Sequence, residues 1–196
     1  MKNILIIVDA QNDFCHEKGA LSNKEACEAA DNIIKMLNKT AFDKIICTMD
    51  THGDNYSETS EGKHLPIPHC KKNTWGWKIR EDLYQELYNQ QNVSFLEKDK
   101  FSPYPTQLWT KVGIVDKHDK IYVCGLCTDI CVISTAFAVK NSMEPEVYLI
   151  ENCCAGSTPE NHFFAVSVMK SCHINIIKGE LPPIGITDEN NKTQTV

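Results

Sequence analysis

The sequence predicts an α/β fold: a doubly wound, mostly parallel six-stranded sheet with helices on both faces. Short apolar runs rich in β-branched residues alternate along the chain with longer stretches whose apolar residues recur every three to four positions. Parallel strands require such helical crossovers, which cover both faces of the sheet. With 196 residues, 42% of them hydrophobic, the chain can bury a sizeable core. We expect one domain over residues 1–178 and a polar C-terminal tail over residues 179–196.

The first half of the chain contains three strands and two helices in alternation. Ile4–Asp9 is an apolar run stopped by a carboxylate, which is typical of a buried strand. Lys24–Asn38 places Ala, Ile and Leu at helical spacing, and Lys44–Asp50 returns to a short apolar run. Trp77–Asn89 has apolar residues on one helical face, and Val93–Lys98 is a short third strand.

The second half continues the same alternation. Asp129–Asn141 is rich in Ala and Val, and Pro159–Ser171 carries a proline in its first turn, so both are predicted helices. The remaining elements are a helix at Thr106–Val112 and strands at Lys120–Leu126, Glu146–Glu151 and His173–Ile177.

Composition and charge exclude several classes of partner. The formal net charge is -6 and the basic residues form no stripe, which argues against nucleic acid. No apolar run approaches the ~20 residues of a membrane span, and Ile4–Val8 is too short for the apolar part of a signal peptide. Ten cysteines without an export signal indicate reduced thiols. We expect a cytoplasmic homo-oligomer that acts on a small molecule.

Three chemically active side chains are predicted at the carboxyl ends of strands, where open α/β sheets bind their ligands. Asp9 follows the first strand, Lys98 ends the third, and Cys131 follows the fourth at the start of a helix. A helix N-terminus stabilises a thiolate, and its free N–H groups can hold an oxyanion. Taken singly, Asp9 could be a turn or capping residue, Lys98 a solvated surface lysine, and Cys131 a buried structural thiol.

A set of metal-ligand types follows the second strand. Asp50 and His52 are two residues apart, so in an extended segment they point to the same side. The alternative is a turn aspartate beside a surface histidine. Nitrogen and oxygen ligands favour Zn, Fe or Mn over Cu(I). The long polar segment that follows offers further ligands, which are His64, His69 and, as an additional one, Glu61.

The pair Cys124 and Cys127 has the Cys-x-x-Cys spacing of thiol redox proteins. A redox pair requires its first cysteine exposed at the start of a helix, whereas Cys124 is predicted inside a strand. A non-hydrolytic redox protein is therefore the weaker hypothesis.

Four segments taken together resemble the isochorismatase-like cysteine hydrolases, and within them the nicotinamidase branch. Their order and spacing match over nearly the whole chain. The segments are Val8–Phe14, Asp50–His52, Glu97–Ser102 and Gly125–Val132.

The resemblance implies a catalytic triad, a metal site and an oxyanion hole. The triad is Asp9, Lys98 and Cys131. The oxyanion hole consists of the backbone N–H groups of Cys127 and Cys131, with a cis peptide at Leu126–Cys127. The metal, one divalent ion that we expect to be Zn, is held by Asp50, His52 and His69, with Glu61 similar to an additional metal-associated acid of some members.

The resemblance also implies a reaction, the hydrolysis of nicotinamide to nicotinate and ammonia through a thioester on Cys131. Phe14, Trp75 and Tyr104 are candidates for the pocket around the substrate ring. Asn73 replaces a glycine that is usual in the family, and asparagine tolerates the positive φ that such a turn needs. The alternative enzyme is a metal-free cysteine amidohydrolase that acts on a carbamoyl or ureido compound.

Overall fold

The computed structural model describes residues 1–113, 115–181 and 184. Within them, six strands form one sheet in the order β3-β2-β1-β4-β5-β6, and every neighbouring pair is parallel. The predicted doubly wound fold is therefore confirmed. The strands are β1 (Asn3–Val8), β2 (Lys44–Asp50), β3 (Val93–Lys98), β4 (Lys120–Leu126), β5 (Glu146–Ala155) and β6 (Asn175–Ile177).

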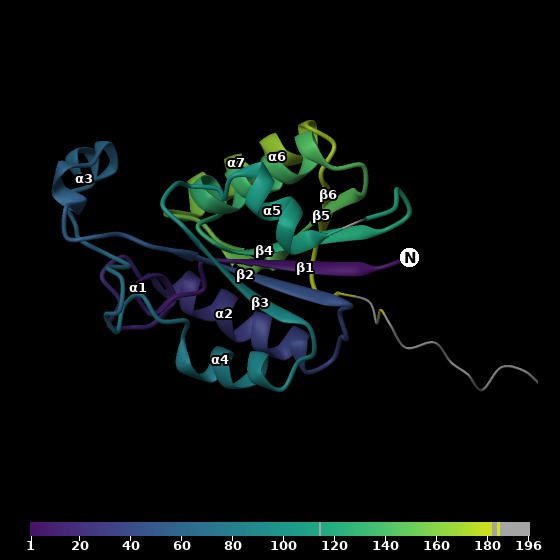
Figure 1. Ribbon diagram of the computed structural model, residues 1–196, viewed down its shortest axis with the longest axis horizontal. Helices are drawn as coiled ribbons and strands as arrows, with labels where there is room; N and C mark the ends of the chain where they lie inside the picture. The colour runs from purple at the N-terminus through teal and green to yellow at the C-terminus, as the bar shows by residue number, and fades with distance from the viewer. Residues whose placement is uncertain (114, 182–183, 185–196) are drawn as a thin grey trace, which may run out of the picture.

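Helices cover both faces of the sheet (Figure 1). Two of them, α2 (Lys24–Leu37) and α4 (Glu81–Tyr88), lie on one face, and three lie on the other. Those three are α5 (Pro105–Val112), α6 (Ile133–Ser142) and α7 (Pro159–Ser171). Shorter elements are α1 (Asn12–Cys15), α3 (Ser60–His64), a 3₁₀ turn at Tyr56–Glu58 and a π-helical turn at Thr128–Val132.

The core follows from the apolar strands. All six residues of β1 are buried, because a central parallel strand is covered by helices on both faces. Each fully buried Ile, Leu or Val contributes about 1.5–3 kcal/mol relative to leaving it exposed. Helix α2 begins where the side chain of Asn23 accepts a hydrogen bond from the backbone N–H of Ala26, and it buries its Ala, Ile and Leu face against the sheet.

Two predicted helices are shorter than their sequence patterns. The segment before α4 stays extended, because Ile79 forms an antiparallel bridge with Gln11 and the N–H of Arg80 bonds to the carbonyl of Ala10. The predicted helix at Asp129–Asn141 starts as the π-helical turn, and its regular α-helix begins only at Ile133. Tertiary contacts override helical propensity in both places.

The strand register brings the candidate residues to one edge. Asp50 pairs with Lys98 at the ends of β2 and β3, and Val8 pairs with Gly125 in β1 and β4. Gly125 has φ +116°, and a Cβ there would lie 2.1 Å from the carbonyl oxygen of Val8, so only glycine allows this approach. In Figure 1, α3 projects beyond this end of the sheet.

The predicted C-terminal tail, residues 179–196, lies mostly outside the described residues. Of its described residues, Leu181 and Ile184 pack against the core and Glu180 forms a 2.9 Å ion pair with Lys39. Among the helices that the structure describes, none has both the length and the apolar character needed to cross a membrane.

Candidate active site

Lys98 connects the two other predicted triad residues. Its Nζ lies 2.7 Å from Asp9 Oδ2 and 3.7 Å from Cys131 Sγ. All three residues are buried, with exposed fractions of 0% for Asp9, 4% for Lys98 and 7% for Cys131. A carboxylate, an ammonium and a thiol thus meet out of bulk water, where charge interactions are stronger than at the surface.

Asp9 is held in place from two sides. Its backbone has φ 48°, in the left-handed region, and its N–H bonds to the carbonyl of Thr48 at 3.2 Å. The hydroxyl of Thr48 donates to Asp9 Oδ1 at 2.6 Å. Burial raises the pKa of Asp9 above its usual value, while Lys98 opposes that rise. The carboxylate is therefore a stronger base than a solvated aspartate.

The charge states of the other two residues follow from the same burial. Burial alone would lower the pKa of Lys98, but the nearby carboxylates of Asp9 and Asp50 raise it above its usual value, so the ammonium stays protonated. Burial raises the pKa of Cys131, and Lys98 only partly offsets this. The resting sulfur is therefore a thiol, and a base must remove its proton before it can act as a nucleophile.

Cys131 lies in a tight turn between β4 and α6. The N–H groups of Ile130 and Val132 both bond to the carbonyl of Cys127, at 3.1 and 3.0 Å. The expected cis peptide at Leu126–Cys127 is present. This turn brings Cys127 and Cys131 to the same cavity.

Four metal-ligand types converge beside the triad. One ligand atom from each of Asp50, His52, Glu61 and His69 lies within 4.8 Å of the others. His52 Nε2 is 2.8 Å from Asp50 Oδ2, and His69 Nε2 is 3.4 Å from both Asp50 Oδ2 and Glu61 Oε1. His64 is exposed on α3, where its Nδ1 contacts the carbonyl of Ser60 at 2.8 Å, so Glu61 joins the cluster and His64 does not.

The cluster fits a divalent metal ion. His52 Nε2 is buried and, within the described residues, has no hydrogen-bond partner in favourable geometry. His69 Nδ1 donates to the carbonyl of Ile67 at 2.9 Å, and its Nε2 lies 3.4 Å from both Asp50 Oδ2 and Glu61 Oε1, where an ion would take the place of the Nε2 proton. Although burial lowers the pKa of His69, its contacts with Asp50 and Glu61 raise it to about 10. Two carboxylates and two imidazoles are a donor set suited to a divalent ion.

A cavity of about 940 Å³ opens over both groups of residues. Phe14 lines it, as predicted, whereas Trp75 and Tyr104 do not. Trp75 packs edge-on against His16 at 4.9 Å, and Tyr104 is 53% exposed at the start of α5. The apolar part of the wall is completed by Leu21, Leu65, Phe101 and Ile130.

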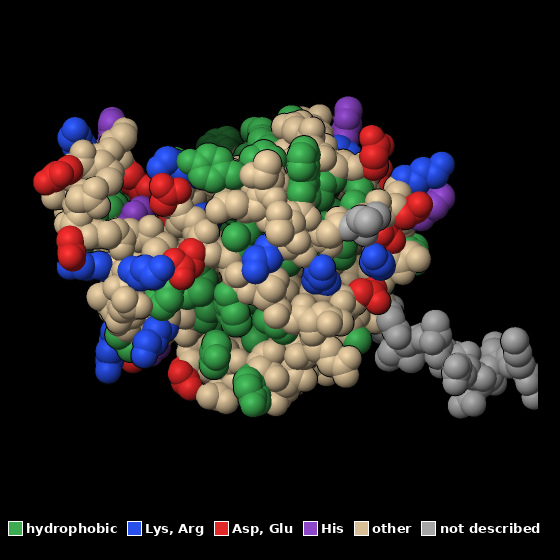
Figure 2. All heavy atoms as spheres, in the orientation of Figure 1, with side chains coloured by type: hydrophobic (Ala, Val, Ile, Leu, Met, Phe, Trp, Pro, Cys, Tyr) green, Lys and Arg blue, Asp and Glu red, His purple; other side chains and the backbone are tan. Residues whose placement is uncertain are grey.

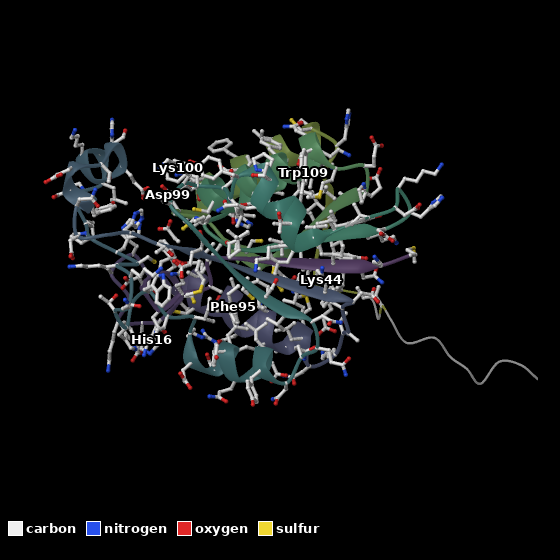
Figure 3. All side chains as sticks on the ribbon, in the orientation of Figure 1. His16, Lys44, Phe95, Asp99, Lys100 and Trp109 are labelled. Carbon is white, nitrogen blue, oxygen red and sulfur yellow. The ribbon has the colours of Figure 1, made fainter. Side chains whose placement is uncertain are left out.

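The rim of this cavity carries charge. Asp99 and Lys100, which line it, lie on the connection after β3, at the end of the sheet that faces α3 (Figure 3). On the face of the molecule shown in Figure 2, basic and acidic side chains are interspersed. That distribution agrees with a small ligand rather than a polyanion.

A family model provides the first comparison with known proteins. The isochorismatase domain matches residues 3–180. The chain belongs to the isochorismatase family. Among curated members, the nicotinamidase of Schizosaccharomyces pombe is 27% identical, covering 91% of this chain and 94% of its own length. The nicotinamidase/pyrazinamidase of Mycobacterium tuberculosis is 29% identical, covering 88% and 97%.

Solved isochorismatase-family structures agree with the fold. Nicotinamidase/pyrazinamidase PncA from Bacillus subtilis superposes with a TM-score of 0.74 at 28% identity, covering 90% of this chain and 99% of that one. The pyrazinamidase of Pyrococcus horikoshii in complex with zinc has a TM-score of 0.71 at 26% identity, covering 91% and 100%.

Several site residues of this isochorismatase-family chain escaped the sequence analysis. Thr48 supports Asp9, and Tyr56 packs its ring at 4.7 Å from that of His52. Gln11 donates to the carbonyl of Asp50 at 2.9 Å and accepts from its N–H at 2.7 Å. Thr48 could have been found, because it lies two residues before Asp50 on the same strand and so on the same face. Gln11 lies in the Val8–Phe14 segment that follows the first strand, but its contact with Asp50 could not be foreseen, and Tyr56 gave no comparable signal.

The geometry disfavours the redox hypothesis. All ten cysteines lie in the described part of the chain and are free thiols. Cys124 is fully buried within β4, as expected, and burial raises the pKa of Cys127 to about 12. Neither sulfur has the exposed, low-pKa character of a redox thiol.

Proposed function

We propose that this protein is a nicotinamidase, a cysteine amidohydrolase that converts nicotinamide and water to nicotinate and ammonia with the help of a divalent metal ion. One observation carries the proposal. Lys98 Nζ lies between the Asp9 carboxylate and the Cys131 thiol, at 2.7 and 3.7 Å, next to a cluster of four metal-ligand types. The catalytic residues are Asp9, Lys98 and Cys131.

The reaction begins with proton transfer from the thiol. Asp9, whose pKa is raised by burial, accepts the proton of Cys131, and the Lys98 ammonium stabilises the resulting thiolate. The sulfur attacks the carboxamide carbon, a C–S bond forms, and the carbonyl electron pair moves onto oxygen. The backbone N–H groups of Cys127 and Cys131 stabilise this oxyanion.

Three further proton transfers complete the cycle. Protonated Asp9 delivers its proton to the leaving nitrogen, the C–N bond breaks, and ammonia departs from a thioester on Cys131. Asp9 then removes a proton from water, whose oxygen attacks the thioester carbon. Cleavage of the C–S bond releases nicotinic acid, which loses its carboxyl proton to the solvent to become nicotinate, and Cys131 regains its proton from Asp9.

The metal site serves substrate orientation. Asp50, His52 and His69, with Glu61 as an additional ligand, would hold the ion, and a bound divalent ion supplies a coordination position for the pyridine nitrogen. We propose zinc, on the basis of the imidazole and carboxylate donors. The likeness to a pyrazinamidase in complex with zinc supports this choice.

Ammonia release distinguishes the proposed reaction from its alternative. We expect purified protein to contain about one divalent ion per chain and to release ammonia from nicotinamide, with activity lost after chelation and restored by Zn²⁺. A protein without metal whose chelator-insensitive activity favours a carbamoyl or ureido compound over nicotinamide would instead be the metal-free amidohydrolase.

A further inference from the structure

Two consecutive residues of the turn that carries the nucleophile form hydrogen bonds with the start of α7. We call residues 127–131 the nucleophile turn and residues 156–162 the α7 entry. Thr128 contacts His162 of the α7 entry, and Asp129 accepts hydrogen bonds from Ser157 of the same segment. The reaction derived above uses none of these four side chains.

The contact between Thr128 and His162 is enclosed. Thr128 is fully buried, and its Oγ1 lies 2.8 Å from His162 Nδ1. Gly156 lies close to the backbone of His162, since a Cβ on Gly156 would lie 2.8 Å from the backbone N of His162 and 2.9 Å from its Cβ. A glycine at 156 thus allows the α7 entry to pack tightly against His162, the residue that contacts Thr128.

The contact between Asp129 and Ser157 is bidentate. The N–H of Ser157 donates to Asp129 Oδ1 at 2.8 Å, and its hydroxyl donates to Oδ2 at 2.6 Å. The same hydroxyl oxygen accepts from Asn161 Nδ2 at 3.0 Å, which ties it to the first turn of α7. Ser157 lines the same active-site cavity as Cys131, so this contact lies at the wall of that cavity.

Internal bonds alone do not position the turn relative to the sheet. The N–H groups of Ile130 and Val132 bond to the carbonyl of Cys127, which sets the shape of the turn but not its place. The turn carries the nucleophile and the N–H groups assigned to the oxyanion, and a misplacement of about 1 Å in such groups can cost about 100-fold in rate.

We propose that His162 and Asp129 are positioning residues, which fasten the nucleophile turn to α7 and so aim the Cys131 thiol and the oxyanion N–H groups at the substrate carbonyl. The inference rests on the proposed amidohydrolase function. It concerns the alignment of the reacting groups, whereas substrate binding depends on the cavity wall and the metal cluster. Loss of either contact, Thr128 with His162 or Asp129 with Ser157, therefore lowers kcat and leaves KM nearly unchanged.

Paired substitutions test the proposal on nicotinamide hydrolysis. We expect His162→Ala and Asp129→Ala each to lower kcat by about 10- to 100-fold, with KM changed less than about 3-fold. His162→Asn and Asp129→Asn should recover most of the rate, because an amide can replace Nδ1 in the first contact and can both accept from and donate to Ser157 in the second. Glu160→Ala is the matched control. It removes an exposed carboxylate of the first α7 turn that takes part in neither contact, and it should match the wild type.

A readout that needs no turnover keeps the proposal separate from the proposed function. The rate at which iodoacetamide alkylates Cys131 is followed by peptide mass. We expect this rate to differ from the wild-type rate in the two alanine variants and to return to it in the two asparagine variants. A wild type that fails to hydrolyse nicotinamide but shows this alkylation pattern would overturn the function and leave the positioning role standing. If the wild type is active, either of two results would overturn the positioning role. In the first, the alanine variants keep the wild-type kcat. In the second, the asparagine variants have the wild-type melting temperature but recover neither the rate of hydrolysis nor the rate of alkylation.

Discussion

At the residue scale, the properties of the site follow from burying three ionisable groups together. A lone carboxylate with no exposed surface would be costly, but Asp9 is stabilised by Lys98 at 2.7 Å and by the hydroxyl of Thr48 at 2.6 Å. Lys98 also lies 3.4 Å from Asp50 Oδ1, so one ammonium links the proposed base to the metal cluster. The triad and the metal ligands therefore form one electrostatic unit.

The pH dependence of the reaction should report on Asp9. Only the deprotonated carboxylate can accept a proton, and burial raises the pKa of Asp9 above its usual value. The rate kcat/KM should therefore rise with pH through the raised pKa of Asp9 and fall as the pH drops below it. Asp9→Asn should lower the rate by at least about 100-fold and abolish this acid limb, as measured by ammonia release between pH 4 and pH 8. A variant with a near-normal rate and an unchanged acid limb would remove Asp9 from the mechanism.

At the element scale, the ends of β1 to β4 place the chemistry and the loops complete it. The register that pairs Asp50 with Lys98 could not be predicted from the sequence. It is this register that places the metal cluster next to the triad. The connection after β2 returns to the sheet by a bridge between His52 and Lys71, which brings His69 to the cluster. Thr59 caps α3 and so fixes the direction of Glu61.

The metal cluster offers a test at this scale. His52→Ala removes the imidazole whose Nε2 lies 2.8 Å from Asp50 Oδ2, so it should remove one ligand and leave the other three in place. We expect metal content well below one ion per chain by elemental analysis and a large loss of nicotinamide hydrolysis. Alkylation of Cys131 should persist, because Asp9 and Lys98 activate the thiol. His64→Ala, outside the cluster, is the control and should retain the metal. Full metal content in His52→Ala would contradict the ligand assignment.

The close approach of β1 and β4 gives a prediction for stability. Gly125→Ala introduces a Cβ 2.1 Å from the carbonyl oxygen of Val8 at a positive φ, so we expect a loss of about 3 kcal/mol or more in the free energy of unfolding. Gly179→Ala is the matched control, since Gly179 also has positive φ but no atom within 4 Å of the added Cβ, and it should cost about 1 kcal/mol. Urea denaturation measures the free energy of unfolding of both variants. Equal losses would show that the positive φ, and not crowding against Val8, causes the destabilisation.

At the scale of the whole molecule, the sequence predicted what depends on local pattern. Apolar runs and helical periodicity define the strands and long helices, and the rule that parallel strands end at one edge brings Asp9, Lys98 and Cys131 together. Features that depend on long-range contacts were missed. The segment before α4 is extended because it pairs with Gln11. Trp75 packs on His16 and does not line the cavity. Asn73 does adopt the expected positive φ, at 67°.

The central claim is that Cys131 is the nucleophile of a nicotinamide hydrolysis. Its most direct test is ammonia release from nicotinamide, with nicotinate identified as the other product. The wild type is compared with two folded variants in which one cysteine is replaced by alanine. The account predicts that Cys131→Ala abolishes turnover, whereas Cys127→Ala, which changes a side chain but keeps the backbone N–H, retains much of it. A Cys131→Ala variant that still releases ammonia, while Cys127→Ala does not, would contradict the account.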